Sequence, residues 1–449
     1  MMKTTTIYKI IFTSLLLVGC TKVDLCDESM HPHVVEGFTV TYNWDAVGLS
    51  AADAPEKLYF VATRILNTRH MVYQTNKDGQ FWVEKNEEEE PGSTPDSDNS
   101  ETSGGNSDNR ENSGTGDPDE LTALEGEYQP DIKLPGGEYF MMAFTDPEYP
   151  KVKVKRKDDK GNVLKDENGE DIEDEMLDKR VELINLNEFK ADEAIPVKQV
   201  KMRHQIVEQK DVSKELVNNW KWADLNPGIG YVRDAGRKLL VARREYLELD
   251  AGKNYTQPFD FVSLTQHIDI HFTIQLVADE KGNQLTKEDI RNIYVEMAGV
   301  APEVSLSTGL LNIAELKRTI VEVTDPELSE STEGGKTTVT LSCKASLEVF
   351  GLVGNTDSYT IAGPGICCIV IYAKTGTDTR AIHAKSNLSR QIKEQEITVE
   401  TGQVNERKKS KDQAMLKIET PFRIVGLNPE MGSDGVCGWE VVGDIHVEI

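Results

Sequence analysis

The sequence predicts an all-β protein made of two tandem β-sandwich domains. Short segments in which apolar and polar residues alternate recur along most of the 449 residues, and such alternation is typical of half-buried strands. Gly, Asn and Asp separate these segments, as expected of turns. Helical periodicity is rare, which favours β-sandwiches over a parallel sheet covered by helices.

The first strand has the clearest pattern. Phe38, Val40, Tyr42 and Trp44 alternate with polar residues, which predicts a strand with one buried face. An Asn-Lys-Asp-Gly sequence at residues 76–79 contains an Asp-Gly pair, which favours a tight hairpin turn. Further strands of the first domain are expected at residues 58–65, 71–74, 80–83 and 132–144.

Two charged excursions interrupt the first domain. Residues 84–127 contain four consecutive glutamates, followed by Ser, Gly, Asn, Asp and Pro with almost no large apolar residue. Such a segment cannot bury enough apolar surface to offset the entropy of ordering it, so a disordered acidic insertion is predicted. Residues 151–180 are also charged and are predicted to form a solvated hairpin, because their Asp and Asn residues do not match the order of a calcium-binding loop.

The chain then returns to strand patterns after one short helix. Asp211 as a capping residue, with apolar residues at helical spacing behind it, predicts the helix over residues 211–220. An Asp-Ala-Gly-Lys-Asn sequence separates two strand runs, so the domain boundary is predicted at residues 250–256, between domains 36–250 and 256–449. Further strands are expected at residues 238–249, 259–276, 293–297, 336–350, 366–372, 396–399, 414–418 and 439–449.

The N-terminus predicts export and a lipid anchor. Lys3 and Lys9 accompany an apolar run at residues 10–18, which is about half as long as a membrane-spanning helix, so residues 1–19 are predicted to be a signal peptide. Leu-Val-Gly-Cys at residues 17–20 resembles the bacterial lipobox, in which the cysteine is acylated and the chain is cut before it. Acyl chains such as palmitate on Cys20 would anchor the protein durably to the outer membrane, with residues 20–35 as the lipidated tether. The alternative is an ordinary signal peptide with a chance cysteine.

Charge and cysteine content restrict the function further. A net charge of −27 argues against binding to nucleic acid and against adsorption to anionic lipid. The cysteines fit neither a zinc pattern nor a disulfide framework, and five remain if Cys20 is lipidated. Cys367 and Cys368 are neighbours on a strand and face opposite sides, so one is expected to be buried; a disulfide from Cys343 to either of them stays open. The six cysteines are Cys20, Cys26, Cys343, Cys367, Cys368 and Cys437.

No arrangement of residues typical of catalysis is recognisable, so a non-enzymatic protein without cofactor or metal is expected. His267, Asp269 and His271 share one face of a strand and are the best metal-ligand candidates, although a solvated face explains them as well. His31 and His33 lie in the tether and lack a third ligand.

The tryptophans are the candidates for binding glycans, because sugars stack on exposed aromatic rings. Trp82 follows a hairpin turn, and it and Trp222 are the two expected to be exposed. Trp44, Trp220 and Trp439 occupy apolar positions of their elements and are expected in the core.

A family resemblance is carried by short segments at residues 20–27, 31–33, 40–44, 134–139, 293–302, 305–309, 438–442 and 445–449. Together these segments resemble a group of Bacteroides-type outer-membrane lipoproteins related to fimbrial anchor and accessory subunits. The resemblance implies transthyretin-like, Greek-key sandwiches, a place at the cell surface, and a role in fimbrium assembly or adhesion with fimbrillin-like subunits as partners. The acidic insertion departs from the usual pattern of this group.

The tether bears on the kind of fimbrial role. Polymerising subunits of such families lose an N-terminal strand after cleavage at a basic residue, so that a neighbouring subunit can supply the missing strand. Between Cys20 and Gly37 the only Lys or Arg is Lys22, and cleavage there would release no strand. We therefore expect an anchor or accessory subunit whose C-terminal strand either completes its own sheet or pairs with the edge of a partner. The alternative function is a surface glycan-binding lipoprotein of a polysaccharide-uptake system.

Overall fold

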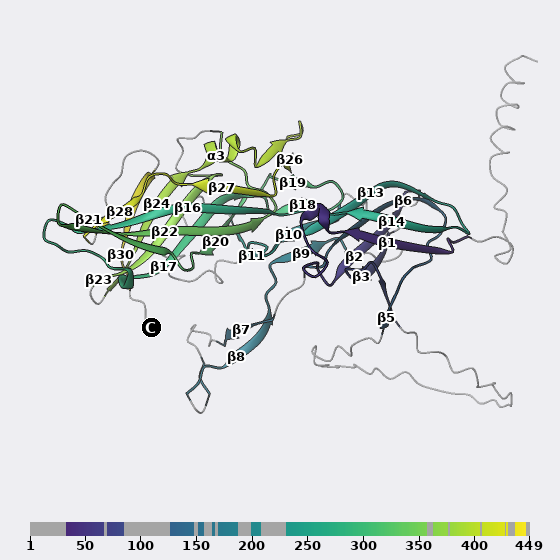
Figure 1. The fold of residues 1–449 in the computed structure, drawn as a ribbon, viewed down its shortest axis with the longest axis horizontal. Helices are drawn as coiled ribbons and strands as arrows, with labels where there is room; N and C mark the ends of the chain where they lie inside the picture. Colours follow the sequence, from purple (N-terminus) through teal and green to yellow (C-terminus); the bar gives the residue numbers. More distant parts are fainter. Residues whose placement is uncertain are drawn as a thin grey trace, which may run out of the picture.

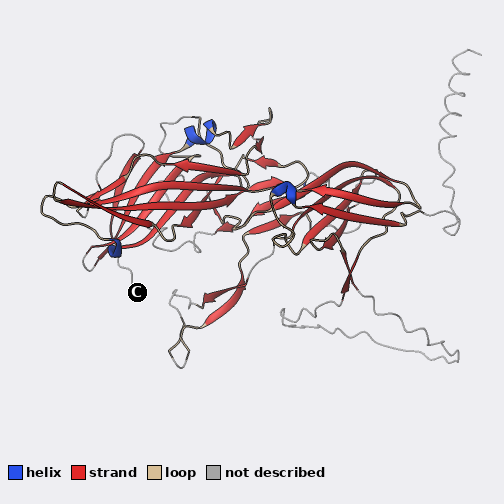
Figure 2. Cartoon of the chain, viewed as in Figure 1, coloured by secondary structure: helices blue, strands red, loops and turns tan. Residues whose placement is uncertain are grey.

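The computed structural model describes most of the chain as β-strands (Figures 1 and 2), which confirms the predicted all-β fold of tandem sandwiches. The described part of the chain contains one short α-helix, α3 (Ser389–Glu394). The described residues are 33–66, 70–84, 126–147, 151–156, 164–166, 169–186, 199–207, 230–356, 362–375, 378–404, 406–426, 428–429 and 436–445.

The first sandwich packs a wide sheet against a narrow one. The narrow layer pairs β1 (Gly37–Asn43) with β14 (Asn254–Asp260) in parallel. Between the layers the ring of Phe60 lies within 6.0 Å of the rings of Phe38, Phe81 and Phe259. The wide sheet consists, in order, of β15 (Val262–Ser263), β13 (Leu240–Leu249), β6 (Gly137–Thr145), β2 (Leu58–Arg64), β3 (His70–Thr75), β4 (Phe81–Glu84) and β5 (Gly126–Gln129).

The sequence-based domain boundary at residues 250–256 falls inside this sandwich. β13 precedes residues 250–253 in the wide sheet, and β14 follows them in the narrow sheet. Phe259 and Phe261 are buried in the first core, and the ring of Phe261 stacks on Trp44 at 4.6 Å. The Gly-containing sequence is therefore a connection between the two layers of one sandwich, and we propose a boundary close to Thr265.

The second sandwich encloses the largest core. Ile268, Ile270 and Ile274 of one sheet are buried against Val295 and Ile369 of the other. One sheet consists, in order, of β11 (Ile206–Val207), β12 (Tyr231–Val232), β20 (Lys317–Glu322), β17 (Ile290–Val300), β23 (Ile366–Thr375), β24 (Asp378–Asn387) and β30 (Val436–Ile445). The other consists of β21 (Glu327–Glu333), β22 (Lys336–Val349), β16 (Gln266–Val277), β28 (Phe422–Val425) and β29 (Asn428–Pro429), with β27 (Gln413–Lys417) also paired to β16.

A smaller middle sheet joins the two sandwiches. A third buried cluster includes Met142 and Phe144 from the outer face of the wide sheet together with Met202, Val304 and Leu311 from the middle sheet. The strands of this sheet therefore come from both halves of the chain. They are β25 (Thr398–Glu400), β26 (Glu406–Lys409), β19 (Leu310–Asn312), β18 (Glu303–Ser305), β10 (Lys201–His204) and β9 (Val181–Ile184).

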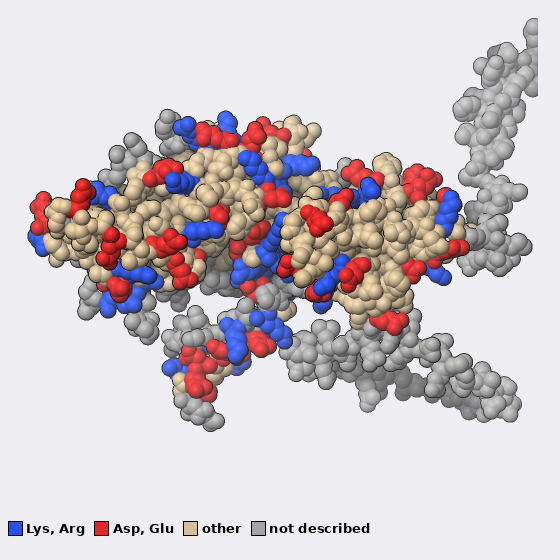
Figure 3. All heavy atoms as spheres, viewed as in Figure 1, with Lys and Arg blue, Asp and Glu red and all other residues tan. Residues whose placement is uncertain are grey.

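Both charged segments, residues 84–127 and 151–180, belong to the N-terminal half of the chain. β7 (Lys151–Lys155) and β8 (Glu173–Leu177) pair as an antiparallel hairpin, as expected, and project from the body as an arm that carries both signs of charge (Figures 1 and 3). The acidic insertion predicted at residues 84–127 lies outside the described residues except at its ends. There Glu84 of β4 pairs with Gly126 of β5, so both ends belong to strands of the wide sheet.

The C-terminal strand completes its own sheet. β30 pairs antiparallel with β24, from Ser386 opposite Val436 to Thr379 opposite Ile445. Of the two arrangements left open by the sequence, the described backbone therefore shows the intramolecular one.

Candidate functional site: a cleft beside the wide sheet

Several predicted sites lie outside the described residues. These are the signal peptide, Cys20, the tether up to residue 32, the helix at residues 211–220, and Trp222. Within the described part, no helix has the length and apolar character needed to cross a membrane.

His267, Asp269 and His271 lie on the half-exposed side of β16, opposite its buried isoleucines. His267 contacts Glu348 at 3.1 Å through Nδ1 and Asp269 at 3.2 Å through Nε2. Asp269 also lies 3.0 Å from the Lys344 ammonium. Burial raises the pKa of Asp269, but hydrogen bonds and nearby cations outweigh this and hold it below its usual value. No cluster of three or more His, Cys, Asp and Glu residues suited to a metal occurs in the described residues, and on this face polar contacts of His267 accompany one ion pair between Lys344 and Asp269.

Cys343, Cys367 and Cys368 are buried and free, so the disulfide left open from Cys343 to either of the other two is not formed. The expectation that one of Cys367 and Cys368 is buried understates the result, because both are. Cys367 faces the second core, whereas Cys368 faces the other side of the sheet, where it lines a small cavity with Glu296. Burial raises the pKa of Cys343 to about 12 and raises the pKa of the other two thiols as well, which keeps them unreactive.

Beside Cys368 lies a buried charged group. Glu296 is 3% exposed and lies 3.2 Å from the Arg318 guanidinium. The Tyr231 hydroxyl donates a hydrogen bond to the same carboxylate. Burial raises the pKa of Glu296 to about 7, although the Arg318 charge opposes the shift. The sequence showed no signal for this group, because its members come from three strands.

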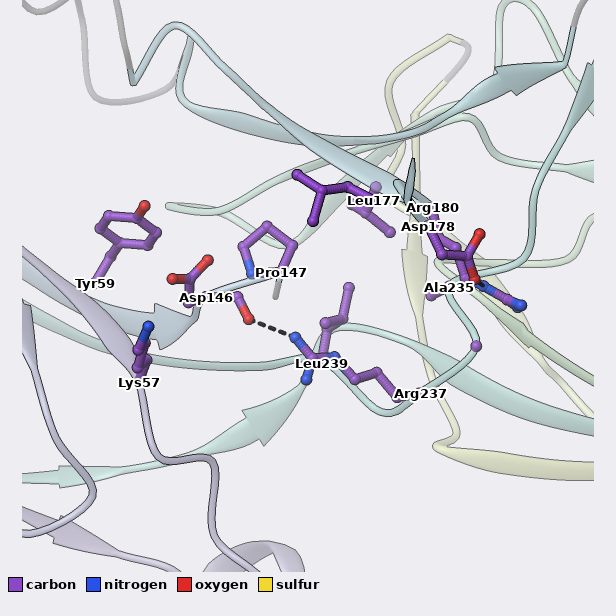
Figure 4. Close-up of a pocket in the computed structure, with 12 residues that line it drawn as sticks. Lys57, Tyr59, Asp146, Pro147, Leu177, Asp178, Arg180, Ala235, Arg237 and Leu239 are labelled. Carbon is purple, nitrogen blue, oxygen red and sulfur yellow. Dashed lines mark hydrogen bonds and ion pairs between the residues drawn. The ribbon is translucent and has the colours of Figure 1, made fainter. Parts of the chain in front are cut away.

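A cleft of roughly 790 Å³ opens where the wide sheet meets the base of the arm (Figure 4). Tyr59 of β2 forms one wall, and its ring lies 5.5 Å from the ring of Phe144. Asp146 and Pro147 follow the end of β6, and the exposed Lys57 precedes β2. Figure 4 shows Lys57, Tyr59 and Asp146 on the same side of the cleft. Burial, and then the Asp146 charge, raise the pKa of Tyr59, so its hydroxyl stays protonated and able to donate a hydrogen bond.

The opposite side of the cleft is held by ion pairs. Arg180 lies 2.8 Å from Asp178 and 2.9 Å from Asp234. Arg237 donates a hydrogen bond of 2.7 Å to the backbone carbonyl of Asp146. The cleft therefore combines apolar walls with polar groups of both charges, which suits a polar ligand that also presents apolar surface.

Trp82, the described glycan-stacking candidate, lies on β4, two strands away from Tyr59 in the wide sheet. Its ring packs edge-on against Tyr128 of β5, with 5.0 Å between the ring centres. Trp82 is half-buried and Tyr128 is 37% exposed, so the pair lies at the surface. The sequence contains no signal for Tyr128, because it directly follows the acidic segment. It contains none for Tyr59 either, because a single Tyr in an apolar strand is usually a buried core residue.

Comparisons with known proteins found no matching family model and no matching curated protein. Among solved structures, the chain is similar to a candidate adhesin from Bacteroides ovatus, with 11% identity, a TM-score of 0.41 and coverage of 92% of this chain and 99% of that one. It is similar to a candidate polysaccharide-binding protein from Bacteroides thetaiotaomicron, with 10% identity, a TM-score of 0.34 and coverage of 92% and 98%. A third similar structure is the fimbrial anchor protein Mfa2 from Porphyromonas gingivalis, with 9% identity, a TM-score of 0.27 and coverage of 87% and 90%.

Proposed function

We propose that this protein is a non-enzymatic lipoprotein of the outer membrane, attached through Cys20 and exposed at the cell surface. There it serves as an anchor or accessory subunit that binds fimbrillin-like subunits by strand pairing. The observation that carries the proposal is the edge of β30, which has β24 as its one neighbour among the described strands.

The length of β30 makes it the best docking edge in the described structure. It has ten residues, and the backbone N–H and C=O groups on its outer side form a template to which a partner strand can add. Its pairing with β24 runs along nearly its whole length, with two shifts of register, and uses the backbone groups of one side only. A partner strand could therefore extend the sheet without breaking an established pair.

The other long edge strands are less suitable. β21 is exposed along all seven residues and carries Glu327, Glu330 and Glu333, and charged side chains are a common way to discourage edge pairing. β14 contains Pro258, which lacks the donor that a ladder needs.

β1 has seven residues, but its Phe38 exchanges backbone hydrogen bonds with Ile132 on the side away from β14. β27 has five residues, and the Gln391 side chain of α3 bonds the backbone of Lys417 in this strand. The other edge strands outside the arm have four residues or fewer.

The position of β30 also suits an anchor. Val35, where the tether enters the fold, is hydrogen-bonded to Leu134 in the first sandwich. β30 belongs to the second sandwich, toward the other end of the molecule (Figure 1). A lipid at one end would thus leave the docking edge directed away from the membrane.

Site-specific crosslinking on intact cells tests this proposal. A photo-crosslinking amino acid in place of Glu440 in β30 is expected to capture a fimbrillin-like subunit. The matched control places the same amino acid at Glu330 in β21, also an edge strand, where no capture is expected. Equal capture from both positions, or none from Glu440, contradicts the proposal. A Cys20→Ala variant that stays in the membrane fraction would separately contradict the lipid anchor.

A further inference from the structure

One row of side chains crosses the wide sheet on its outer face. Tyr59 of β2 is opposite Phe144 of β6 on one side and Gln74 of β3 on the other. Thr75 pairs with Phe81, which places Gln74 beside Trp82 at the next position. Trp82 in turn is opposite Tyr128. Residues opposite each other on neighbouring antiparallel strands share a face, so these five side chains form one line across five strands.

The alternation of side chains confirms which face this is. Phe60, Tyr73 and Phe81, the immediate neighbours of three members of the row, point into the first core. Neighbours along a strand face opposite sides, so the row itself points away from that core. It therefore belongs to the surface that the middle sheet covers only in part.

The row becomes more exposed from one end to the other. Phe144 is fully buried against the middle sheet. Tyr59 and Trp82 are half-buried, and Tyr128 at the sheet edge is 37% exposed. The part from Tyr59 to Tyr128 begins in the cleft and continues over the open face for three strand spacings, about 15 Å.

Polar groups accompany the open part. The Gln74 side chain lies within the row, between Tyr59 and Trp82. Lys57 and Asp146 lie beside Tyr59 where the row enters the cleft (Figure 4). Amide, ammonium and carboxylate groups are suited to hydrogen-bond the hydroxyl groups of a ligand, while the rings offer flat apolar faces.

From these observations we infer that the open row of Tyr59, Gln74, Trp82 and Tyr128 is a binding site for an extended polysaccharide chain. A sugar ring presents C–H groups on its faces and hydroxyl groups around its rim, which matches three aromatic rings with a polar amide between the first and the second. A row one residue wide is poorly suited to a protein partner, because protein interfaces need a broader buried centre. The site lies in the first sandwich, away from β30, so it does not depend on the proposed fimbrial role.

Affinity electrophoresis of the full chain through gels that contain a polysaccharide tests the inference. The probes are dextran and galactomannan, which are neutral, and polygalacturonate, which is anionic. We expect at least one probe to retard the protein. Trp82→Ala and Tyr128→Ala are each expected to weaken that binding about tenfold, which corresponds to about 1.4 kcal/mol. Tyr246→Ala is the matched control, because Tyr246 is 79% exposed on β13 but lies outside the row.

The outcomes distinguish an acidic from a neutral polysaccharide, and specific binding from non-specific adsorption. Retardation by polygalacturonate alone, lost in Lys57→Gln, supports an acidic polysaccharide, and retardation by a neutral probe that Lys57→Gln leaves intact supports a neutral one. Absence of binding to all three probes overturns the inference. An equal loss in Tyr246→Ala and Trp82→Ala also overturns it, since that result indicates non-specific adsorption to aromatic side chains. Failure of crosslinking at β30 would leave this test unaffected.

Discussion

His204 on β10 offers a sharp test of the interface between the sandwiches. It is fully buried, its ring lies 4.1 Å from the ring of Phe350, and its Nε2 accepts a hydrogen bond of 3.2 Å from the Phe350 backbone N–H. Burial disfavours the charged form and lowers its pKa from 6.5 to about 3. The folded protein therefore keeps this ring neutral at a pH where the unfolded chain takes up a proton.

The magnitude follows from that difference in pKa. The stabilising effect of the neutral ring is fully present above pH 6.5 and is lost as the pH falls, at about 1.4 kcal/mol per pH unit. Between pH 6.5 and pH 5 the loss amounts to about 2 kcal/mol. His204→Gln keeps an acceptor but cannot titrate, so it should be less stable than the parent by about 1–3 kcal/mol at pH 7.5 through imperfect hydrogen bonding.

The assay is urea unfolding of the parent and His204→Gln proteins at pH 7.5, 6.5 and 5.0. The difference between the two free energies of unfolding should shrink by about 2 kcal/mol from pH 6.5 to pH 5.0. All other titrating groups are common to both proteins and cancel in this difference. Parallel pH profiles would refute the reasoning, because they would mean that His204 titrates alike in the folded and unfolded chains.

Three further predictions concern the second sandwich. Burial raises the pKa of Glu296 to about 7 in the folded protein, so between pH 4.5 and pH 7 the unfolded chain loses this proton first. The free energy of unfolding should therefore fall by about 1.4 kcal/mol for each pH unit in that range. Glu296→Gln should abolish this fall in the same unfolding assay. Cys343, Cys367 and Cys368 should react with a thiol reagent within minutes in denaturant and much more slowly in the native protein, and rapid native labelling at any of these three positions, located by peptide mass spectrometry, would contradict their burial. Gly299→Ala should lower the free energy of unfolding by several kcal/mol more than Gly335→Ala. Both glycines have positive φ, but a Cβ at Gly299 would lie 2.1 Å from the Val353 carbonyl oxygen whereas Gly335 faces open space.

The sequence predicted the long strands because their side chains carry the signal directly. β16 alternates between buried and half-buried residues along nearly its whole length, as its isoleucines indicated. The turn at residues 76–79 was also predictable, since the Gly79 N–H bonds to the Asn76 carbonyl and its φ is +80°.

Pairings between distant strands were not predictable. β1 joins β14 across more than two hundred residues, and no local pattern reports such a contact. For this reason the turn at residues 250–253 was taken for a domain boundary. The middle sheet was missed because its strands have three or four residues, too few for a periodic pattern.

Of the residues in the candidate site, the sequence identified only one. Trp82 was identified from its place beside a turn, whereas its relation to Tyr59 and Tyr128 depends on the register of four strands. A single sequence does not contain that register. The polar wall of the cleft likewise combines residues from the ends of β2 and β6 with others from the base of the arm.

The pairing of Glu84 with Gly126 has a consequence for how this protein can change over evolution or in the laboratory. The segment at residues 85–125 leaves and re-enters the fold at two backbone positions held one strand spacing apart, about 5 Å. The entropic cost of fixing the two ends of a chain segment at such a separation grows only with the logarithm of its length, by about 0.6 kcal/mol for each doubling. The length and composition of this segment can therefore drift, or be exchanged for a foreign peptide, at almost no cost to the sandwich that carries it.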